Sequence, residues 1–515
     1  MKRFLYPFRL AIVFALLTLL GPLALAQEPV GGTGSTHGGG GSGSTTDMLG
    51  GASGVTTSRR TPRRTVPRPV TTATATSRRR PRPAGTGRQP ALDADDYYEQ
   101  GNTYREAEKY EQALEAYKQA VRLNPGFAEA QYILGWTYNE LEHYAEAVAP
   151  LQQAIRLKSD YAFAYYELGY AYRKQSRNME ALAAYKQAIS YKNDYALAYY
   201  DLGWTYNDLK QYSEALVPLN QAIRFKPDYA EAHNELGYAY GHLRRYTDAI
   251  ENYKAAIGLK PDYSEALFAL GDLYFYNMKQ YGDAADAYKR ALQISPDNAT
   301  AFYNLGWSYN DLQQYAPAVE ALKNAIRLKS DYVEAHSELG YSYRQLGQNA
   351  EAVASYRRAI NIKPDYATAY FGLGDVYYYS TKQYAQAAEA YAQGLRLNPE
   401  AATATTLYNL GWSYNDLQQY AQAVEPLQRA IRIKAEYKQA HTELGYAYRH
   451  LNRYAEAVAS YKQALRLDPQ YGDAHYNLGI TYLAMNNRNG AMEEYRILKT
   501  INPEQAEKLN AEINK

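Results

Sequence analysis

Cysteine is absent from this chain of 515 residues. Without cysteine there is no disulfide, no thiol nucleophile, no zinc site built on thiolates and no lipid attached to an N-terminal cysteine. The folded part of the protein must therefore be held together by packing and by noncovalent bonds alone.

Enzyme signatures are missing as well. The chain contains no G-x-S-x-G, H-E-x-x-H or Walker motif, the patterns that place nucleophiles, zinc ligands and phosphate-binding loops. No stretch outside the repeats described below is long enough for a second folded domain. We therefore expect a non-enzymatic protein with no catalytic residue and no cofactor.

Only one long apolar run is present, from Leu10 to Leu20. Positive charges precede it and Ala-Leu-Ala ends at residue 26, which is the three-part pattern of a secretory signal. An uncleaved membrane anchor is the alternative, but Gly21-Pro22 breaks a run that is already short for a bilayer span. We expect a signal peptide over residues 1–26 and an exported protein of a bacterial periplasm, cell envelope or extracellular space. After cleavage we expect no transmembrane segment.

Residues 27–92 almost lack large apolar side chains. They are rich in Gly, Ser and Thr and then in Arg and Pro, a composition that cannot bury enough surface to offset chain entropy. We expect a disordered linker. It holds ten arginines, from Arg59 to Arg88, against two carboxylates, and residues 93–515 carry a net negative charge. These arginines would suit an anionic envelope surface; the alternative is a solvated linker that charge keeps extended. We expect no nucleic-acid partner.

From residue 94 onward, a glycine recurs about every 34 residues. A tyrosine stands three residues after each glycine, and an alanine twelve or thirteen after most of them. The twelve glycines are Gly101, Gly135, Gly169, Gly203, Gly237, Gly271, Gly306, Gly340, Gly374, Gly411, Gly445 and Gly479. Within each period, apolar residues three and four apart form two blocks split by a short polar turn, which predicts two helices.

This pattern resembles the tetratricopeptide repeat, with its L-G-x-x-Y core, its alanine and its final proline. The resemblance implies an all-α fold, a right-handed superhelical α-solenoid of tandem helix-turn-helix units, preceded by the disordered N-terminal region. We expect twelve units over residues 93–505 and a capping helix over residues 506–515. Aspartate and glutamate three residues apart predict capping boxes at Asp228, Asp262 and Asp331, with Glu231, Glu265 and Glu334.

The units, numbered 1 to 12 in chain order, recur in threes. A G-W-[ST]-Y-N-[DE] unit is followed by an H-x-E-L-G-Y unit and then by a longer unit with Gly-Asp, in the series 4-5-6, 7-8-9 and 10-11-12. This explains why YNLGWSYNDLQQYA occurs at 303–316 and again at 408–421. His233, His336 and His441 lie three units apart, which is too far for a shared metal ion in a stack of helices about 8 to 10 Å apart. We expect no metal site.

In the family that the chain resembles, the first helix of each unit lines a concave groove. The residues after the glycine would then point into it, and aromatic rings beside amides and carboxylates suit an extended peptide or a glycan. Packing between helices of neighbouring units is the alternative role for the tryptophans. The candidate groove residues are Trp204, Asn207, Asp208, Tyr238, Trp307, Asn310, Asp311, Tyr341, Arg344, Trp412, Asn415, Asp416, Tyr446 and Arg449.

Together these features predict an exported scaffold for protein-protein interaction in the cell envelope, with a protein or an extended peptide in the groove. A module that binds a glycan or a cell-wall polymer through periodic aromatics is the alternative. A third possibility is a targeting subunit of a glycosyltransferase complex, which would need a separate catalytic partner.

Overall fold

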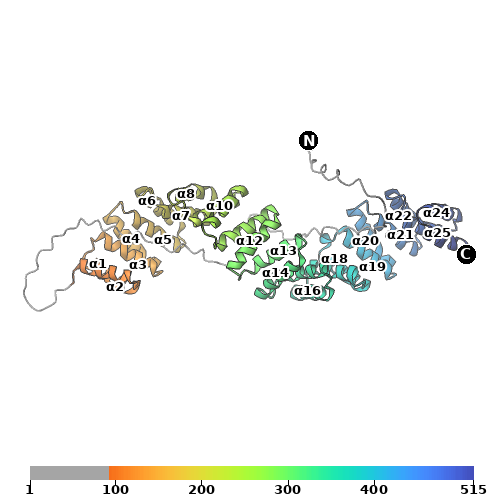
Figure 1. Cartoon of the computed structure of the whole chain (residues 1–515), viewed down its shortest axis with the longest axis horizontal. Helices are drawn as coiled ribbons and strands as arrows, with labels where there is room; N and C mark the ends of the chain where they lie inside the picture. The colour runs from red at the N-terminus through yellow and green to blue at the C-terminus, as the bar shows by residue number, and fades with distance from the viewer. Residues whose placement is uncertain (1–91) are drawn as a thin grey trace, which may run out of the picture. The chain divides into compact units, whose positions relative to one another are not determined.

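The computed structural model describes residues 92–515, and all regular structure in this range is helical. The predicted signal peptide over 1–26 and the predicted linker, apart from Leu92, lie outside the described residues. Figure 1 shows the helices following one another in adjacent pairs. The prediction of an α-solenoid of tandem helix-turn-helix units is confirmed.

Each unit consists of a first and a second helix. The pairs are, in chain order, α1 (Ala94–Glu106) and α2 (Tyr110–Leu123); α3 (Ala128–Glu140) and α4 (Tyr144–Leu157); α5 (Ala162–Lys174) and α6 (Asn178–Tyr191); α7 (Ala196–Asp208) and α8 (Tyr212–Phe225); α9 (Ala230–His242) and α10 (Tyr246–Leu259); α11 (Ser264–Asp272) with η1 (Leu273–Met278) and α12 (Tyr281–Ile294); α13 (Ala299–Asp311) and α14 (Tyr315–Leu328); α15 (Val333–Gln345) and α16 (Asn349–Ile362); α17 (Ala367–Asp375) with η2 (Val376–Ser380) and α18 (Tyr384–Leu397); α19 (Ala404–Asp416) and α20 (Tyr420–Ile433); α21 (Lys438–His450) and α22 (Tyr454–Leu467); α23 (Gly472–Ala484) and α24 (Arg488–Ile501).

The two helices of each unit form the closest packing, and each second helix also packs on the first helix of the next unit. Successive first helices touch one another, as α3 with α5 and α7 with α9 do, more closely than successive second helices do. The first helices therefore lie on the inner side of the stack. No unit buries its apolar face alone, so the core runs from unit to unit.

The recurring glycines allow the two helices of a unit to approach closely. A Cβ atom built on Gly306 would lie 2.6 Å from Cγ of Leu322, and one on Gly374 would lie 2.6 Å from the ring of Tyr391. The second helix presents leucine at this place in the units that contain tryptophan and tyrosine in most of the others. These large side chains are fully buried because the glycines make room for them.

The predicted capping boxes at Asp228, Asp262 and Asp331 are wrong. Each helix begins two residues later, and its N-cap is a tyrosine (Tyr229, Tyr263 or Tyr332) with no side-chain cap bond. Tyr229 is 1% exposed and its ring lies 4.8 Å from that of Tyr200. Burial of the aromatic ring, not an acidic cap, fixes where these helices start. A capping box is present at Asp93 and Asp96, where no preceding unit packs.

The turn between the two helices of every unit contains one residue with left-handed backbone. Eleven of these residues are not glycine, with φ between 56° and 61°, and the twelfth is Gly347 with φ 73°. A side chain at such a φ costs about 1 kcal/mol. The tight turn is thus present in all twelve units, and in eleven of them it holds a residue with an unfavourable backbone conformation.

We therefore expect Lys210→Gly to raise the free energy of unfolding by about 0.5 to 1 kcal/mol. Lys210 is exposed and its φ is 58°, so the substitution relieves strain and removes little packing. Urea denaturation measures the change. Gly347→Ala is the matched opposite and should lose a similar amount; equal stability of both variants and the wild type would contradict the argument.

The long units owe their extra length to two local features. In units 6 and 9, the first helix ends in a π-helical turn, η1 or η2, which absorbs one additional residue. A short 3-10 helix, η3 (Pro399–Ala401), lengthens the connection before α19. Such π-helical turns often accompany functional sites because they re-aim side chains.

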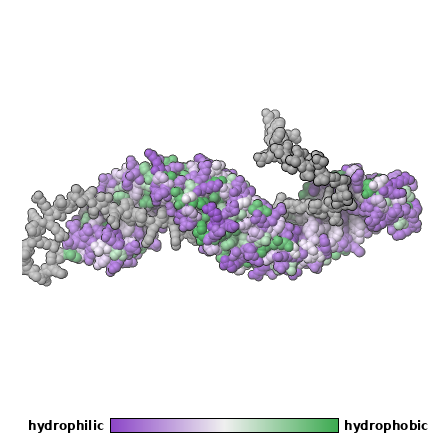
Figure 2. Space-filling view, viewed as in Figure 1, coloured by the Kyte–Doolittle hydropathy of each residue, from purple (hydrophilic) through white to green (hydrophobic). Residues whose placement is uncertain are grey.

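The last helix, α25 (Pro503–Ile513), covers the end of the stack. It begins three residues before the expected position because Pro503 occupies its first turn and the side chain of Asn502 accepts the Gln505 N–H. Leu509 and Ile513 are buried against unit 12. The face shown in Figure 2 is mostly hydrophilic, and the exposed apolar side chains, such as Met179 and Val217, lie mainly on second helices.

Candidate functional site

The three candidate tryptophans lie half-buried on first helices, against the preceding unit. The Trp307 ring centre is 4.6 Å from that of Tyr281 and 5.1 Å from that of Phe275. Trp412 meets Tyr384 in the same way, at 4.6 Å. The Arg173 guanidinium lies 4.4 Å from the ring of Trp204. These rings fill the packed interface between two neighbouring units, which we call a joint. Only part of each ring surface is exposed.

The candidate asparagines are buried inside the joints. Asn207, Asn310 and Asn415 are 2%, 3% and 5% exposed. The amide of Asn207 donates to both the backbone carbonyl and the carboxylate of Glu235, each at 3.0 Å. Asn310 binds Glu338 and Asn415 binds Glu443 in the same manner. A ligand on the surface would therefore meet the neighbours of these amides and not the amides themselves.

The glutamates of these bonds were missed by the sequence analysis. Each lies 28 residues after its asparagine, within the H-x-E-L-G-Y pattern, so a constant spacing was available as a signal. Glu235 is 4% exposed, and burial raises the pKa of Glu443 to about 7. Buried carboxylates are stable only with such partners.

We expect Asn310→Ala to lower the free energy of unfolding by about 2 kcal/mol, because the Glu338 carboxylate then loses a donor bonded at 2.9 Å. The neighbouring Asp311 is exposed, so Asp311→Ala should change stability by less than about 0.5 kcal/mol. Urea denaturation measures the free energy of unfolding of both variants, and the comparison tests whether Asn310 is buried while Asp311 is exposed. A similar loss in both would contradict the assignment.

The candidate aspartates, in contrast, are open to solvent. Asp208, Asp311 and Asp416 are exposed at the ends of α7, α13 and α19. Asp208 accepts a bond from Asn178 at 2.9 Å across the joint. Each aspartate stands four residues after a half-buried tryptophan, and this pair recurs in units 4, 7 and 10.

The tyrosine and arginine candidates lie in the units that follow. Tyr238, Tyr341 and Tyr446 are half-buried, each about 6 Å from the first tyrosine of the preceding second helix. The Arg344 guanidinium lies 5.6 Å from the ring of Tyr341, and that of Arg449 lies 5.1 Å from the ring of Tyr446. The structure therefore brings these two pairs together.

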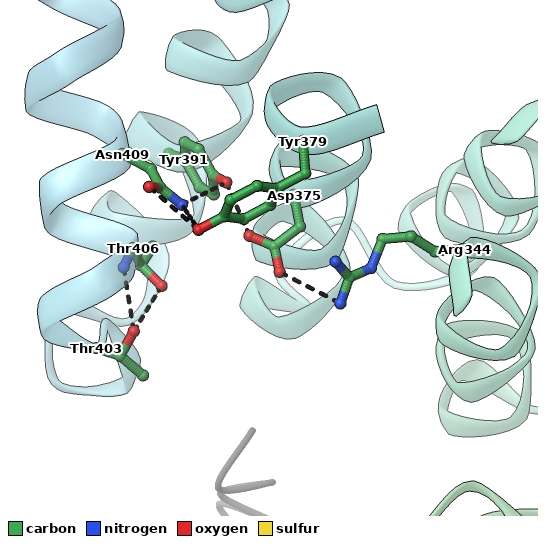
Figure 3. Close-up of polar contacts among 7 residues, drawn as sticks. All are labelled: Arg344, Asp375, Tyr379, Tyr391, Thr403, Thr406 and Asn409. Carbon is green, nitrogen blue, oxygen red and sulfur yellow. Dashed lines mark hydrogen bonds and ion pairs between the residues drawn. The ribbon is translucent and has the colours of Figure 1, made fainter. Parts of the chain in front are cut away.

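A network of polar side chains links units 8, 9 and 10 (Figure 3). The Tyr391 hydroxyl donates to Oδ1 of Asp375 at 2.7 Å, and Arg344 lies 3.8 Å from Oδ2 of the same carboxylate. The amide of Asn409 donates to the hydroxyls of Tyr379 and Tyr391. The π-helical turn η2 brings Tyr379 to this position. Asp375 and Tyr379 both lie in the long unit with Gly-Asp that the sequence analysis singled out.

The equivalent network at units 6 and 7 has the same bonds but no arginine. The Tyr288 hydroxyl donates to Oδ1 of Asp272 at 2.6 Å, and Asn304 bonds to Tyr276 and Tyr288. Burial raises the pKa of Asp272 to about 7, and only the Tyr288 hydrogen bond opposes this effect. At Asp375 burial also raises the pKa, but the Arg344 charge opposes it.

The buried histidines support the joints. Nε2 of His336 and of His441 lies 3.1 and 3.2 Å from the backbone carbonyls of Ser330 and Ala435. Burial lowers the pKa of both histidines. Residues 92–515 contain no group of three His, Asp or Glu side chains that could hold a metal ion. In the same range, no helix has both the length and the apolar character needed to cross a membrane.

Comparisons with known proteins agree with this architecture. The model described as "TPR repeat" matches residues 169–206, 203–243, 306–345, 340–378 and 445–486, and the model described as "Tetratricopeptide repeat" matches residues 98–162, 234–299 and 371–438. Among curated proteins, none matches the chain.

Solved structures of the same kind match parts of the chain. YrrB, described as a TPR protein with an unusual peptide-binding site, is 26% identical over 38% of this chain and 99% of its own, with a TM-score of 0.36. The MamA protein is 27% identical over 33% of this chain and 92% of its own, with a TM-score of 0.31. A chain of the Cut9-Hcn1 hetero-tetramer of the APC/C is 16% identical over 82% of this chain and 97% of its own, with a TM-score of 0.34.

Family models thus match most of the helical region, and the structure shows the same paired helices from unit to unit. The chain belongs to the tetratricopeptide repeat family.

Proposed function

We propose that this protein is a non-enzymatic scaffold that binds an extended segment of a partner protein along the face formed by its first helices. The observation that carries the proposal is the recurrence of a half-buried tryptophan with an exposed aspartate four residues later, in units 4, 7 and 10. Half-buried aromatic rings offer contact area at low entropic cost, and exposed carboxylates offer hydrogen-bond acceptors. The family, as a class of interaction repeats, supports the same reading.

The proposed location of the protein is the cell envelope. The signal pattern over residues 1–26 supports export, and the arginines from Arg59 to Arg88 would attach the exported protein to an anionic surface. Vesicles that contain phosphatidylglycerol should retain the full chain at low salt. Added salt, or replacement of the ten arginines by serine, should release it.

The scaffold proposal is tested with a displayed library of random peptides and the full chain. We expect selected peptides to bind, and the triple variant Asp208→Ala, Asp311→Ala, Asp416→Ala to bind them at least about tenfold more weakly. A matched control removes three exposed carboxylates from the second helices, at Glu214, Glu320 and Glu425. Equal losses in both triple variants would show a general charge effect and would count against the groove.

A glycan or a cell-wall polymer is the second candidate ligand, because aromatic rings that recur with a regular period suit a polymer with a regular repeat. Sedimentation with insoluble peptidoglycan tests it directly. Binding of the full chain to peptidoglycan together with failure to select any peptide would replace the first proposal by the second.

A further inference from the structure

The joint between the second and third unit of each triplet exists in three copies, which differ in charge. In the middle copy, Arg344 on α15 faces Asp375 on α17, with N and O 3.8 Å apart. In the first copy, the residues at the same places are Gly241 and Asp272. In the third copy they are Arg449 and Ile480. Only the middle copy therefore carries both charges.

Asp272 and Asp375 make the same hydrogen bond to a tyrosine, but only Asp375 has an arginine beside it. Both accept a tyrosine hydroxyl, at 2.6 and 2.7 Å, and the two tyrosines are buried. Among residues 92–515, no lysine, arginine or histidine nitrogen lies within 4 Å of the Asp272 carboxylate. The groups that face it are the Tyr288 hydroxyl of α12 and, beyond it, Tyr276 of η1 and Asn304 of α13. None of these carries a positive charge.

The residue at the place equivalent to Arg344 is a glycine. Gly241 has no atoms beyond its backbone, whereas the guanidinium of Arg344 extends from the equivalent place in α15 to Asp375. Asp272 itself is half-buried. Burial without a positively charged partner disfavours the charged form, and burial does raise the pKa of Asp272.

We propose that Asp272 and Gly241 form a subsite for an arginine or lysine side chain of the bound segment, which takes the place that Arg344 fills in the sister unit. The proposal rests on the scaffold function proposed above and adds the chemistry of the ligand. A guanidinium or an ammonium supplies a charge-assisted hydrogen bond to a half-desolvated carboxylate. The basic side chain belongs to a partner protein, and the net negative charge of residues 93–515 favours a basic segment of that partner.

The test is a selection from a displayed library of random peptides against the full chain and three variants. We expect one basic position to be enriched in the peptides selected by the wild type. Gly241→Arg supplies the cation within the protein, so enrichment should disappear and selected peptides should bind at least about tenfold more weakly. Asp272→Asn should weaken the same peptides without introducing a bulky side chain. Arg344→Gly creates a second opening at Asp375, so a second basic position should become enriched.

Each outcome decides one question. Peptides that bind without a basic preference, or whose binding is unchanged in both Gly241→Arg and Asp272→Asn, overturn the subsite and leave the scaffold function standing. Failure to select any peptide overturns both. Urea denaturation of each variant shows that it is folded. A chain with serine in place of the ten arginines tests the other occupant: stronger capture of basic peptides by this chain would assign the subsite to residues 59–88 and overturn the partner, whereas unchanged capture supports a partner.

Discussion

Leu322→Ala is expected to lower the free energy of unfolding by about 3 kcal/mol and Gly306→Ala by about 1 to 2 kcal/mol, whereas the double variant should lose clearly less than the sum. Leu322 is 0% exposed, so truncation leaves a cavity at the centre of unit 7. A Cβ atom on Gly306 would lie 2.6 Å from Cγ and 2.9 Å from Cδ2 of Leu322, which is too close. Removing the leucine removes the clash and lets the new methyl group fill part of the cavity.

Hydrogen exchange at the amides of α13 and α14, together with urea denaturation, measures the effect. Local exchange is needed because a stack of repeats can open unit by unit, so a single unfolding transition does not report on one unit alone. Gly258→Ala is the control, since a Cβ atom there meets nothing within 4 Å. It should leave stability unchanged or improve it slightly through helix propensity. Strict additivity of the losses at Gly306 and Leu322 would contradict the proposed contact.

The structural role of the periodic residues could be predicted from the sequence because each plays the same role in every unit. Glycine against a large buried side chain is required wherever two helices cross closely, so its spacing predicted the paired helices correctly. Helix starts were predicted less well, because the pattern Asp-x-x-Glu matches a capping box while burial of the adjacent tyrosine decides the boundary. At these helix starts, burial of the tyrosine ring determines the boundary, and the capping bond that the aspartate and glutamate could make does not form.

The candidate site was predicted only as a set, not residue by residue. Asn310 and Asp311 are neighbours in the sequence, yet one is 3% exposed and bonded to the next unit and the other is exposed. Consecutive residues on a helix point about 100° apart, and the sequence alone did not say which of them faces the joint. The answer depends on Glu338, 28 residues later. The tryptophan-asparagine-aspartate set thus divides into a packing residue, a joint residue and a surface residue.

The triplet period is explained in the same terms. Neighbouring units are linked by an asparagine-glutamate bond, then by an arginine-aspartate pair where both residues are present, then by an aspartate-tyrosine-asparagine network. Each kind of joint needs different residues on its two sides, so the unit sequence returns only after three joints. The three-unit repeat of the sequence therefore encodes three successive interfaces between units as well as a surface.

Asp272→Asn is expected to raise the free energy of unfolding by about 2 kcal/mol at pH 8 and to have little effect at pH 4. The pKa of Asp272 is raised from 3.8 to about 7 in the folded protein. Because the folded state holds this proton more tightly than the unfolded state, the stability it contributes is complete below about pH 4. That contribution falls as the pH rises and is lost above about pH 7. Because Asp272 is only half-buried, the effect on stability stays below the full value of the pKa shift.

Asp375→Asn is the matched control at the equivalent position. It should raise stability at pH 8 by clearly less than Asp272→Asn does, because burial also raises the pKa of Asp375 but the charge of Arg344, with a side chain only 19% exposed, opposes that effect. Urea denaturation of the wild type and both variants at pH 4 and pH 8 gives the comparison. The difference between the wild type and each variant isolates the aspartate from Glu443, whose pKa is also about 7, and from the buried histidines. A clearly smaller gain in Asp375→Asn than in Asp272→Asn at pH 8 is the result that separates a carboxylate with a cationic partner from one without; equal gains would mean that Arg344 does not stabilise the charged form of Asp375.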